Sequence, residues 1–359
     1  MAANYWDSSQ RRYWTFTRQE LADIRQRLED KHRHLVQLYP LPDRRLLNIF
    51  FCQQLQRFSK RGTLGTKQQA LATAQVYMRR FYSKVEIRET NPYLVLSTAL
   101  YLACKVEECP QHIRHVVGEA RQTWPDVITS DTSKMGETEF ALISVMSSQL
   151  IVHHPYRTLL DLSPTFNLSP DELSLAWWII NDHYVTDLPL LHSPHVIALT
   201  AALLAVVLNP VQAAWSAGKE KELAAMRSGG AAAMRSDGDP VQKVGAILQH
   251  GMHQNRAVQA AMQSVVQAAL GSAFSGGGAA GQELPGSGNT GGAGGAPTPA
   301  LSAKVQKMMN WLAESEVDIE AMVDCTQEMI SLYEVWETYK EKDCKEVIGK
   351  FVKGRGLDK

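Results

Sequence analysis

The chain has 359 residues and 45% of them are hydrophobic, which is enough for two ordinary domains with filled cores and excludes a chain that is disordered as a whole. Its 37 basic residues balance its 37 acidic ones, so a protein that holds nucleic acid through counterion release is not expected. The five cysteines show no C-x-x-C spacing and fit no disulfide framework, which indicates a reducing compartment.

The N-terminal segment, residues 1–42, begins MAANYWDSSQRRYW and lacks the apolar stretch of a signal peptide. Its first part is rich in aromatic residues, namely Tyr5, Trp6, Tyr13, Trp14 and Phe16. Such residues either fix the first helix to the domain that follows or anchor a partner, because Trp and Tyr are favoured at interfaces. Apolar residues at helical spacing then predict that first helix, at Leu21, Ile24, Leu28 and Leu35.

Helical periodicity continues through residues 43–152, and no stretch shows the strict alternation of a half-buried strand. A helix is expected to start at Asn91-Pro92, because proline is well suited to the first turn. The other helices expected in this region lie at about 46–58, 71–81, 111–122 and 132–149.

Pro155 opens a second series of helices, within residues 153–342. This series is interrupted by the insert 211–302, whose Gly, Ala, Pro and Ser residues predict disorder over much of its length. A long insertion is tolerated because the free energy of loop closure grows only logarithmically with length. A C-terminal tail is expected at 343–359. The helices expected in the second series lie at about 156–162, 170–185, 194–208, 303–313 and 317–340.

The two series are related by an internal repeat. A shift of 102 positions aligns 71–103 with 173–205 without a gap and places Pro92 on Pro194. Each copy joins an amphipathic helix to a helix that is apolar on every face, and such a helix must be enclosed by others. The apolar run ending at 208 is too short to cross a membrane. The sequence therefore predicts two tandem helical bundles in a soluble, intracellular, all-α protein.

A lysine ends the apolar helix of the first copy, in the stretch YLACKVEE. The second copy has Val207 at the position of Lys105, so folding of the bundle does not require a lysine there. Lys105 either pairs with Glu108 three residues later at an ordinary helix end or has a function of its own.

Several stretches resemble the cyclin family, and C-type cyclins in particular. They are YLACKVEE, GETEFALISVMSSQLIVHHPYR, the start MAANYWDSSQ, WWIINDHYVTDLPLL and MISLYEVW, and together the matching regions cover nearly all of the chain outside 211–302. The resemblance implies an N-terminal helix followed by two tandem five-helix cyclin boxes. It also implies a nuclear, non-enzymatic subunit without cofactor, which binds and activates a cyclin-dependent kinase of the Mediator kinase module and so regulates transcription by RNA polymerase II.

The resemblance further implies which residues meet the kinase. Lys105 and Glu139 are expected to grip it beside its αC helix, Glu137 is a rival for the glutamate position, and Glu108 belongs to the same K-V-E-E motif. A groove between the boxes is a candidate contact for other kinase-module subunits, although solvated polar side chains would explain part of the same pattern. Its candidate residues are Tyr5, Trp6, Trp177, Asn181 and Asp182.

Other classes of protein fit less well. The adjacent His153 and His154 point about 100° apart on a helix, and no further ligand lies at zinc-site spacing. No nucleophile motif favours an enzyme. The alternatives that remain are a cyclin H type activator of another transcriptional kinase and a DNA-binding protein like transcription factor IIB, which would need a zinc ribbon and a basic face. The stretch DRRLLNIFFCQQL departs from the M-R-A-I-L patch of cell-cycle cyclins, so substrate docking there is not expected.

Overall fold

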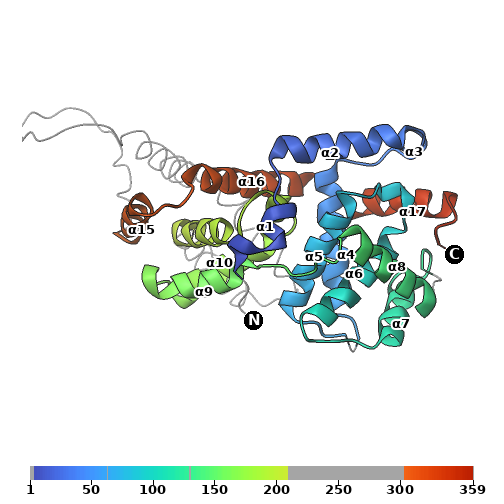
Figure 1. Cartoon of the computed structure of the whole chain (residues 1–359), viewed down its shortest axis with the longest axis horizontal. Coiled ribbons are helices and arrows are strands. Elements are labelled where there is room, and N and C mark those ends of the chain that lie inside the picture. The colour runs from blue at the N-terminus through green and yellow to red at the C-terminus, as the bar shows by residue number, and fades with distance from the viewer. Residues whose placement is uncertain (1–3, 63, 129–130, 209–302, 359) are drawn as a thin grey trace, which may run out of the picture.

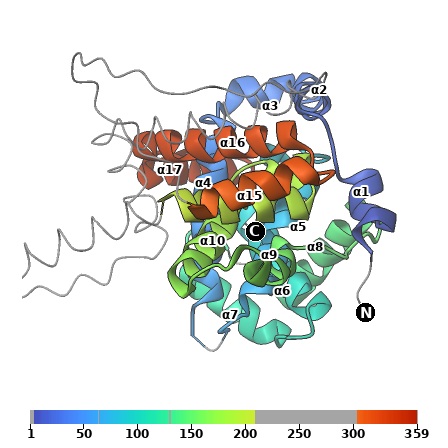
Figure 2. The same ribbon diagram turned by 90° about the vertical axis from the view of Figure 1, so that its left-hand side faces the viewer.

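The computed structural model describes residues 4–62, 64–128, 131–208 and 303–358, and within them it contains helices and no strand. The predicted all-α fold is confirmed. The helices form two bundles that lie side by side, with an N-terminal helix across them (Figures 1 and 2). The predicted insert at 211–302 lies outside the described residues.

The first bundle surrounds α6, because that helix is apolar on nearly every face. Pro92 begins the helix, and the Asn91 side chain accepts a hydrogen bond from the Tyr93 N–H at 3.1 Å, as the N-cap residue of a helix does. Leu96 and Ala99 are fully buried in the core. The bundle consists of α4 (Arg44–Ser59), α5 (Gln68–Tyr82), α6 (Pro92–Val106), α7 (Ile113–Thr123) and α8 (Thr132–Val145), with the short helix η2 (Ile87–Glu89) after α5.

The second bundle repeats this arrangement around a helix that begins at residue 194, which is 102 residues after the start of α6, and that continues to 208, the last residue described before the insert. The start of this helix agrees with the offset predicted from the internal repeat. Ser169 and Glu172 form a capping box that starts the amphipathic helix of this copy. The bundle consists of α9 (Pro155–Phe166), α10 (Pro170–His183), α11 (Leu188–Leu191), helix 194–208, α15 (Ala303–Glu314) and α16 (Ile319–Thr338).

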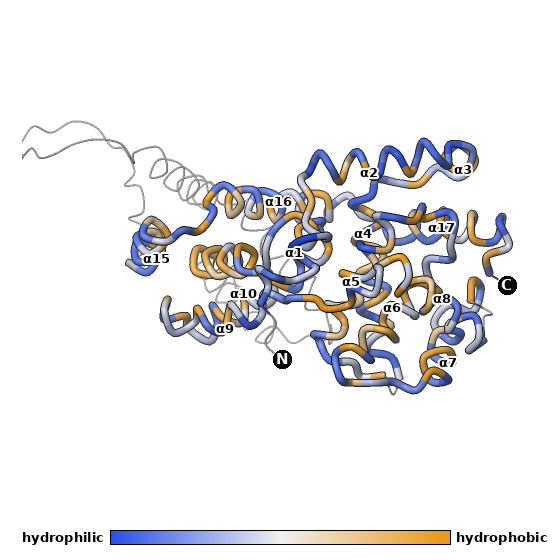
Figure 3. Tube along the Cα trace, in the orientation of Figure 1, coloured by the Kyte–Doolittle hydropathy of each residue, from blue (hydrophilic) through white to orange (hydrophobic). Residues whose placement is uncertain are grey.

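The N-terminal helices are mostly hydrophilic along α2 and α3 and are attached to the bundles largely through charged side chains (Figure 3). Arg18 pairs with Asp324 of α16 at 2.8 Å, and Arg25 pairs with Asp187 at 2.7 Å. Trp14 lies fully buried, and its indole N–H donates to Gln149. The elements of this segment are η1 (Tyr5–Asp7), α1 (Ser9–Tyr13), α2 (Arg18–Lys31) and α3 (Arg33–Leu38).

The last helix, α17 (Glu341–Gly354), returns to the first bundle (Figure 1). Its buried residues recur at helical spacing on one face and share a core with α4, α5 and α6. They are Cys344, Ile348, Phe351 and Val352. The segment 343–359, which was expected as a tail, is therefore mostly helix and completes the core of the first bundle.

Candidate partner-binding site

Lys105 and Glu139 form an ion pair between α6 and α8. The Lys105 side chain is 41% exposed and that of Glu139 is 15% exposed. The ammonium group also lies 4.5 Å from the ring centroid of Tyr101, one turn earlier on α6, which is a cation–π contact. The structure thus brings together two residues that lie 34 positions apart and that the family resemblance singled out.

The backbone at the end of α6 explains why Lys105 reaches the surface there. Glu108 has a left-handed backbone conformation, with φ of 52°, and the Cys109 N–H donates to the Cys104 carbonyl at 2.9 Å. This geometry ends the helix at Val106, two residues after the buried Cys104. Lys105 pairs across the bundle with Glu139, so the alternative of a local pair with Glu108 is not what the structure shows.

The neighbouring Glu107 points inward and holds the end of α6 in place. It accepts hydrogen bonds from the Thr73 hydroxyl and the Gln69 amide, both at 2.6 Å, and lies 3.9 Å from the His154 ring. Burial alone would raise the pKa of Glu107, but the nearby His154 ring and the hydrogen bonds from Thr73 and Gln69 hold it below its usual value. The Glu107 side chain therefore has a structural role at the helix end, whereas the side chains of Lys105 and Glu108 are exposed.

A large aromatic side chain is exposed next to the ion pair. Phe140 follows Glu139 on α8 and is 74% exposed. Glu137 is exposed on the same helix and pairs with Lys134 at 3.5 Å. Phe140 was missed in the sequence, although a signal was present, because it departs from the buried stripe of α8. That stripe consists of Met135, Leu142 and the following Met146.

The ion pair at Lys105 contributes too little to the stability of the fold to explain why a lysine is present there. Partly exposed ion pairs contribute about 0–1 kcal/mol, because water screens the charges and two long side chains lose freedom. In the second bundle the equivalent Val207 packs partly buried against the core, so a different side chain serves folding at that position. A lysine, a glutamate and exposed aromatic surface at one place are suited to binding another protein.

The aromatic residues of η1 lie where the N-terminal segment meets the second bundle. Tyr5 is buried and packs edge-on against His195, with ring centroids 5.1 Å apart. Trp6 is 53% exposed, and its ring centroid lies 5.0 Å from that of the same histidine. The Arg11 guanidinium lies over the Trp6 ring, 5.3 Å from its centroid, which is a cation–π contact. Tyr5 thus anchors η1, while Trp6 is available to a partner.

The candidate groove residues on α10 differ in how deeply they are buried. Trp177 packs on Tyr156 at 4.6 Å, and Asn181 accepts hydrogen bonds from the Tyr156 hydroxyl at 2.8 Å and from the Gln68 amide at 3.1 Å. Both are half-buried. Asp182, in contrast, is only 1% exposed and accepts a hydrogen bond at 2.9 Å from a tyrosine of α16. Asp182 is therefore a core residue of the second bundle, contrary to its expected place at the surface of a groove.

Known proteins identify the family. The cyclin N-terminal domain family matches residues 56–151, which run from α4 to the end of the first bundle. A protein of Aspergillus clavatus, an "RNA polymerase II holoenzyme cyclin-like subunit", is 52% identical over 360 residues and covers 100% of both chains. The chain belongs to the cyclin family. A relative of the same name from Neurospora crassa is 51% identical over 364 residues, again with 100% of both chains covered.

A solved structure has the same fold as this cyclin. One chain in the structure of the CAK complex from Chaetomium thermophilum bound to ATP-gamma-S matches with a TM-score of 0.50 and 17% identity. The match covers 97% of this cyclin and 88% of that chain. The two bundles are thus cyclin boxes, as the family resemblance implied. Within the described parts of this cyclin, no group of three His, Cys, Asp or Glu side chains is arranged to hold a metal, and no helix is long and apolar enough to span a bilayer.

Proposed function

We propose that this cyclin is the regulatory subunit of a cyclin-dependent kinase and that Lys105 and Glu139 hold the kinase. The observation that carries the proposal is the surface ion pair between α6 and α8, beside the exposed Phe140. Cyclins are regulatory subunits without catalysis of their own. A kinase needs its αC helix and activation loop in place before it can orient ATP, and a rigid bundle that binds only this arrangement stabilises it.

The chemistry of the pair suits a helix end or loop of a partner. The Lys105 ammonium group has three donors and the Glu139 carboxylate has about four acceptor sites, so each retains capacity for backbone carbonyls and amides after pairing. Tyr101 and Phe140 add apolar surface that would exclude water from these bonds. Glu137 and Glu108, both exposed, are the further acidic groups that such a partner could meet.

The kinase we propose is that of the Mediator kinase module, with transcription by RNA polymerase II as the regulated process and the nucleus as the location. The resemblance to C-type cyclins supports this choice, and so do relatives named as RNA polymerase II holoenzyme subunits. For the other subunits of the module we propose a contact at Trp6 together with Trp177 and Asn181, which keep exposed surface. The buried Asp182 is not part of this contact.

Charge reversal tests the kinase site. Lys105→Glu and Glu139→Lys each remove the ion pair, whereas the double variant restores it with the charges exchanged. If the pair served only the fold, the double variant would bind the kinase like the wild type. If both residues contact the kinase, the double variant stays defective, because truncating or reversing a buried interface charge costs about 2–5 kcal/mol, which is a loss of roughly 30-fold or more in affinity.

The measurement is co-purification with the candidate Mediator kinase, together with kinase activity on a peptide substrate. Circular dichroism checks that every variant folds. Glu137→Lys tests the rival position, because it reverses an exposed carboxylate that lies two residues from Glu139 and pairs with Lys134 of its own helix. Loss of binding in Glu137→Lys but not in Glu139→Lys would assign the contact to Glu137. Wild-type binding by the double variant would refute the proposed site.

A further inference from the structure

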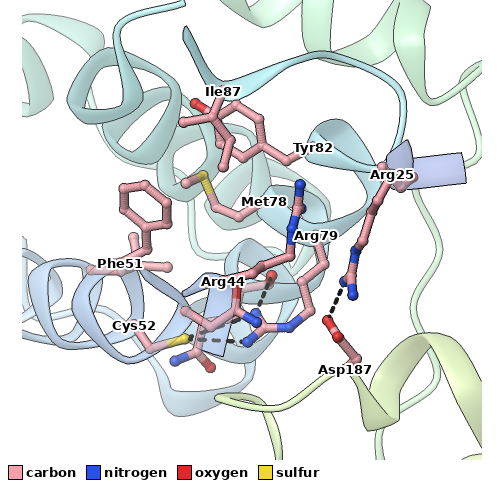
Figure 4. A pocket seen from close by; sticks show the side chains of 13 residues that line it. Arg25, Arg44, Phe51, Cys52, Met78, Arg79, Tyr82, Ile87 and Asp187 are labelled. Carbon is pink, nitrogen blue, oxygen red and sulfur yellow. Dashed lines mark hydrogen bonds and ion pairs between the residues drawn. The ribbon is translucent and has the colours of Figure 1, made fainter. Parts of the chain in front are cut away.

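A pocket between α2, α4, α5 and the start of α11 gathers three arginine side chains (Figure 4). Arg25 comes from α2, Arg44 from α4 and Arg79 from α5, and Asp187 is the carboxylate at its edge. The empty space there is about 510 Å³, a figure that includes open solvent. None of the elements that carry Lys105 and Glu139 contributes to it, so this is a separate place on the molecule.

The arginines are not equally paired. Arg25 donates to Asp187 at 2.7 Å, and Arg79 donates to the Thr186 carbonyl at 2.6 Å. The Arg44 side chain takes part in none of the hydrogen bonds and ion pairs that join the described residues to one another. Three guanidinium groups therefore face one carboxylate, so the pocket carries an excess of positive charge.

The surroundings leave Arg44 charged but poorly compensated. Burial, and then the charge of Arg25, lower its pKa to about 10, which still leaves it protonated at neutral pH. The other carboxylates that act on it are Glu86 and Glu29. Glu86 is already paired with an arginine of η2, and Glu29 is exposed on α2. Neither therefore provides Arg44 with a close counter-ion.

Two further polar atoms in the pocket are buried without a hydrogen-bond partner among the described residues: Arg25 Nε and Gln75 Oε1. Gln75 is only 6% exposed. Buried polar groups nearly always have a partner, so two unpaired atoms on residues that line the same pocket indicate a ligand or an ordered water with hydrogen-bonding capacity close by. A 180° rotation of the Gln75 amide presents its NH₂ group, which would make it a donor beside the arginines.

We propose that this pocket binds a phosphate monoester, the group carried by a phosphoserine or phosphothreonine side chain. A tetrahedral dianion offers oxygens to several donors at once, and guanidinium groups bind phosphate through paired hydrogen bonds. Arg44 supplies the uncompensated charge, Arg25 Nε supplies an unused donor, and the Gln75 amide supplies a further donor once it is rotated. The apolar Phe51 and Met78 beside them would contact the carbon atoms of the side chain that carries the phosphate. This site goes beyond the proposed kinase contact and does not depend on it.

The test is isothermal titration calorimetry on the full chain, at an ionic strength held constant with sodium chloride. The probes are a capped peptide with phosphoserine between alanines, the same peptide with serine, and inorganic phosphate. We expect the phosphopeptide to bind and the serine peptide not to bind. Arg44→Gln should weaken binding about tenfold or more, because one charge-assisted contact is lost. Arg27→Gln makes the same charge change at an exposed position of α2 and should leave the affinity unchanged.

Asp187→Asn should act in the opposite direction. It removes the resident carboxylate that competes for Arg25, so phosphopeptide affinity should rise, and this result remains informative if Arg44→Gln does not fold. Tighter binding of the phosphopeptide than of inorganic phosphate supports a protein-borne ligand. Equal binding of the two supports the site with a free phosphate compound as its ligand. Absence of binding by both probes, or equal affinity in Arg44→Gln and Arg27→Gln, would overturn the proposal.

Discussion

Replacing Phe351 by alanine should destabilise the first bundle strongly. Phe351 lies near the end of α17, is fully buried in the core of the first bundle, and has its ring 6.4 Å from that of Tyr39. A buried Phe→Ala change removes the transfer free energy of the ring and leaves a cavity, which together amount to about 3–5 kcal/mol. A domain is stable by about 5–15 kcal/mol, so this single change should remove about a fifth or more of the total.

Urea unfolding followed by circular dichroism measures the effect, and Phe140→Ala provides the control. That change has the same chemistry but acts on a side chain that is 74% exposed, so the free energy of unfolding should change by no more than about 0.5 kcal/mol. If Phe351→Ala also lowered the free energy of unfolding by less than about 1 kcal/mol, then α17 would not be part of the core, and the reasoning from its burial would be refuted.

Two further predictions concern the second bundle. Tyr333→Phe removes the hydroxyl that donates to the buried Asp182 at 2.9 Å, and should lower the free energy of unfolding in urea by about 1–3 kcal/mol; an unchanged midpoint would contradict this role. Asp324 has a pKa below its usual value, because hydrogen bonds from His192 and Arg18 outweigh the opposing effect of burial. Its contribution is therefore present above the unfolded pKa of about 3.9 and is lost as the pH falls through the lower folded value. The stability difference between wild type and Asp324→Asn should shrink from pH 6 to pH 3, and a constant difference would refute the assignment.

The repeat allowed much of the fold to be predicted from the sequence. An apolar helix such as α6 has one stable place, inside a bundle, so its copy at 194–208 could be located by pattern alone. Lys105 could be singled out because its counterpart in the repeat is Val207. Its pairing with Glu139 rested on the family resemblance, since no local spacing connects positions on two separate helices.

Long-range packing accounts for what the sequence did not predict. The buried positions of α17 do follow a helical stripe, but a stripe does not indicate which bundle it will cover, and the segment is rich in charge. Asp182 was expected at the surface because an acid in an amphipathic helix is usually solvated, whereas Tyr333 provides a buried partner 151 positions away. The pocket of Arg25, Arg44 and Arg79 was likewise invisible, because three separate helices meet there.

The position of α17 also sets the order in which the chain can mature on the ribosome. Residues 146–340 separate the end of α8 from the start of α17, so the first bundle lacks one wall of its core while they are being made. At about 5–20 residues per second, this interval lasts roughly 10–40 s. During it the apolar face that receives Phe351 is uncovered. A ribosome that stops before codon 341 releases a product whose first bundle lacks the side chains that α17 places in its core.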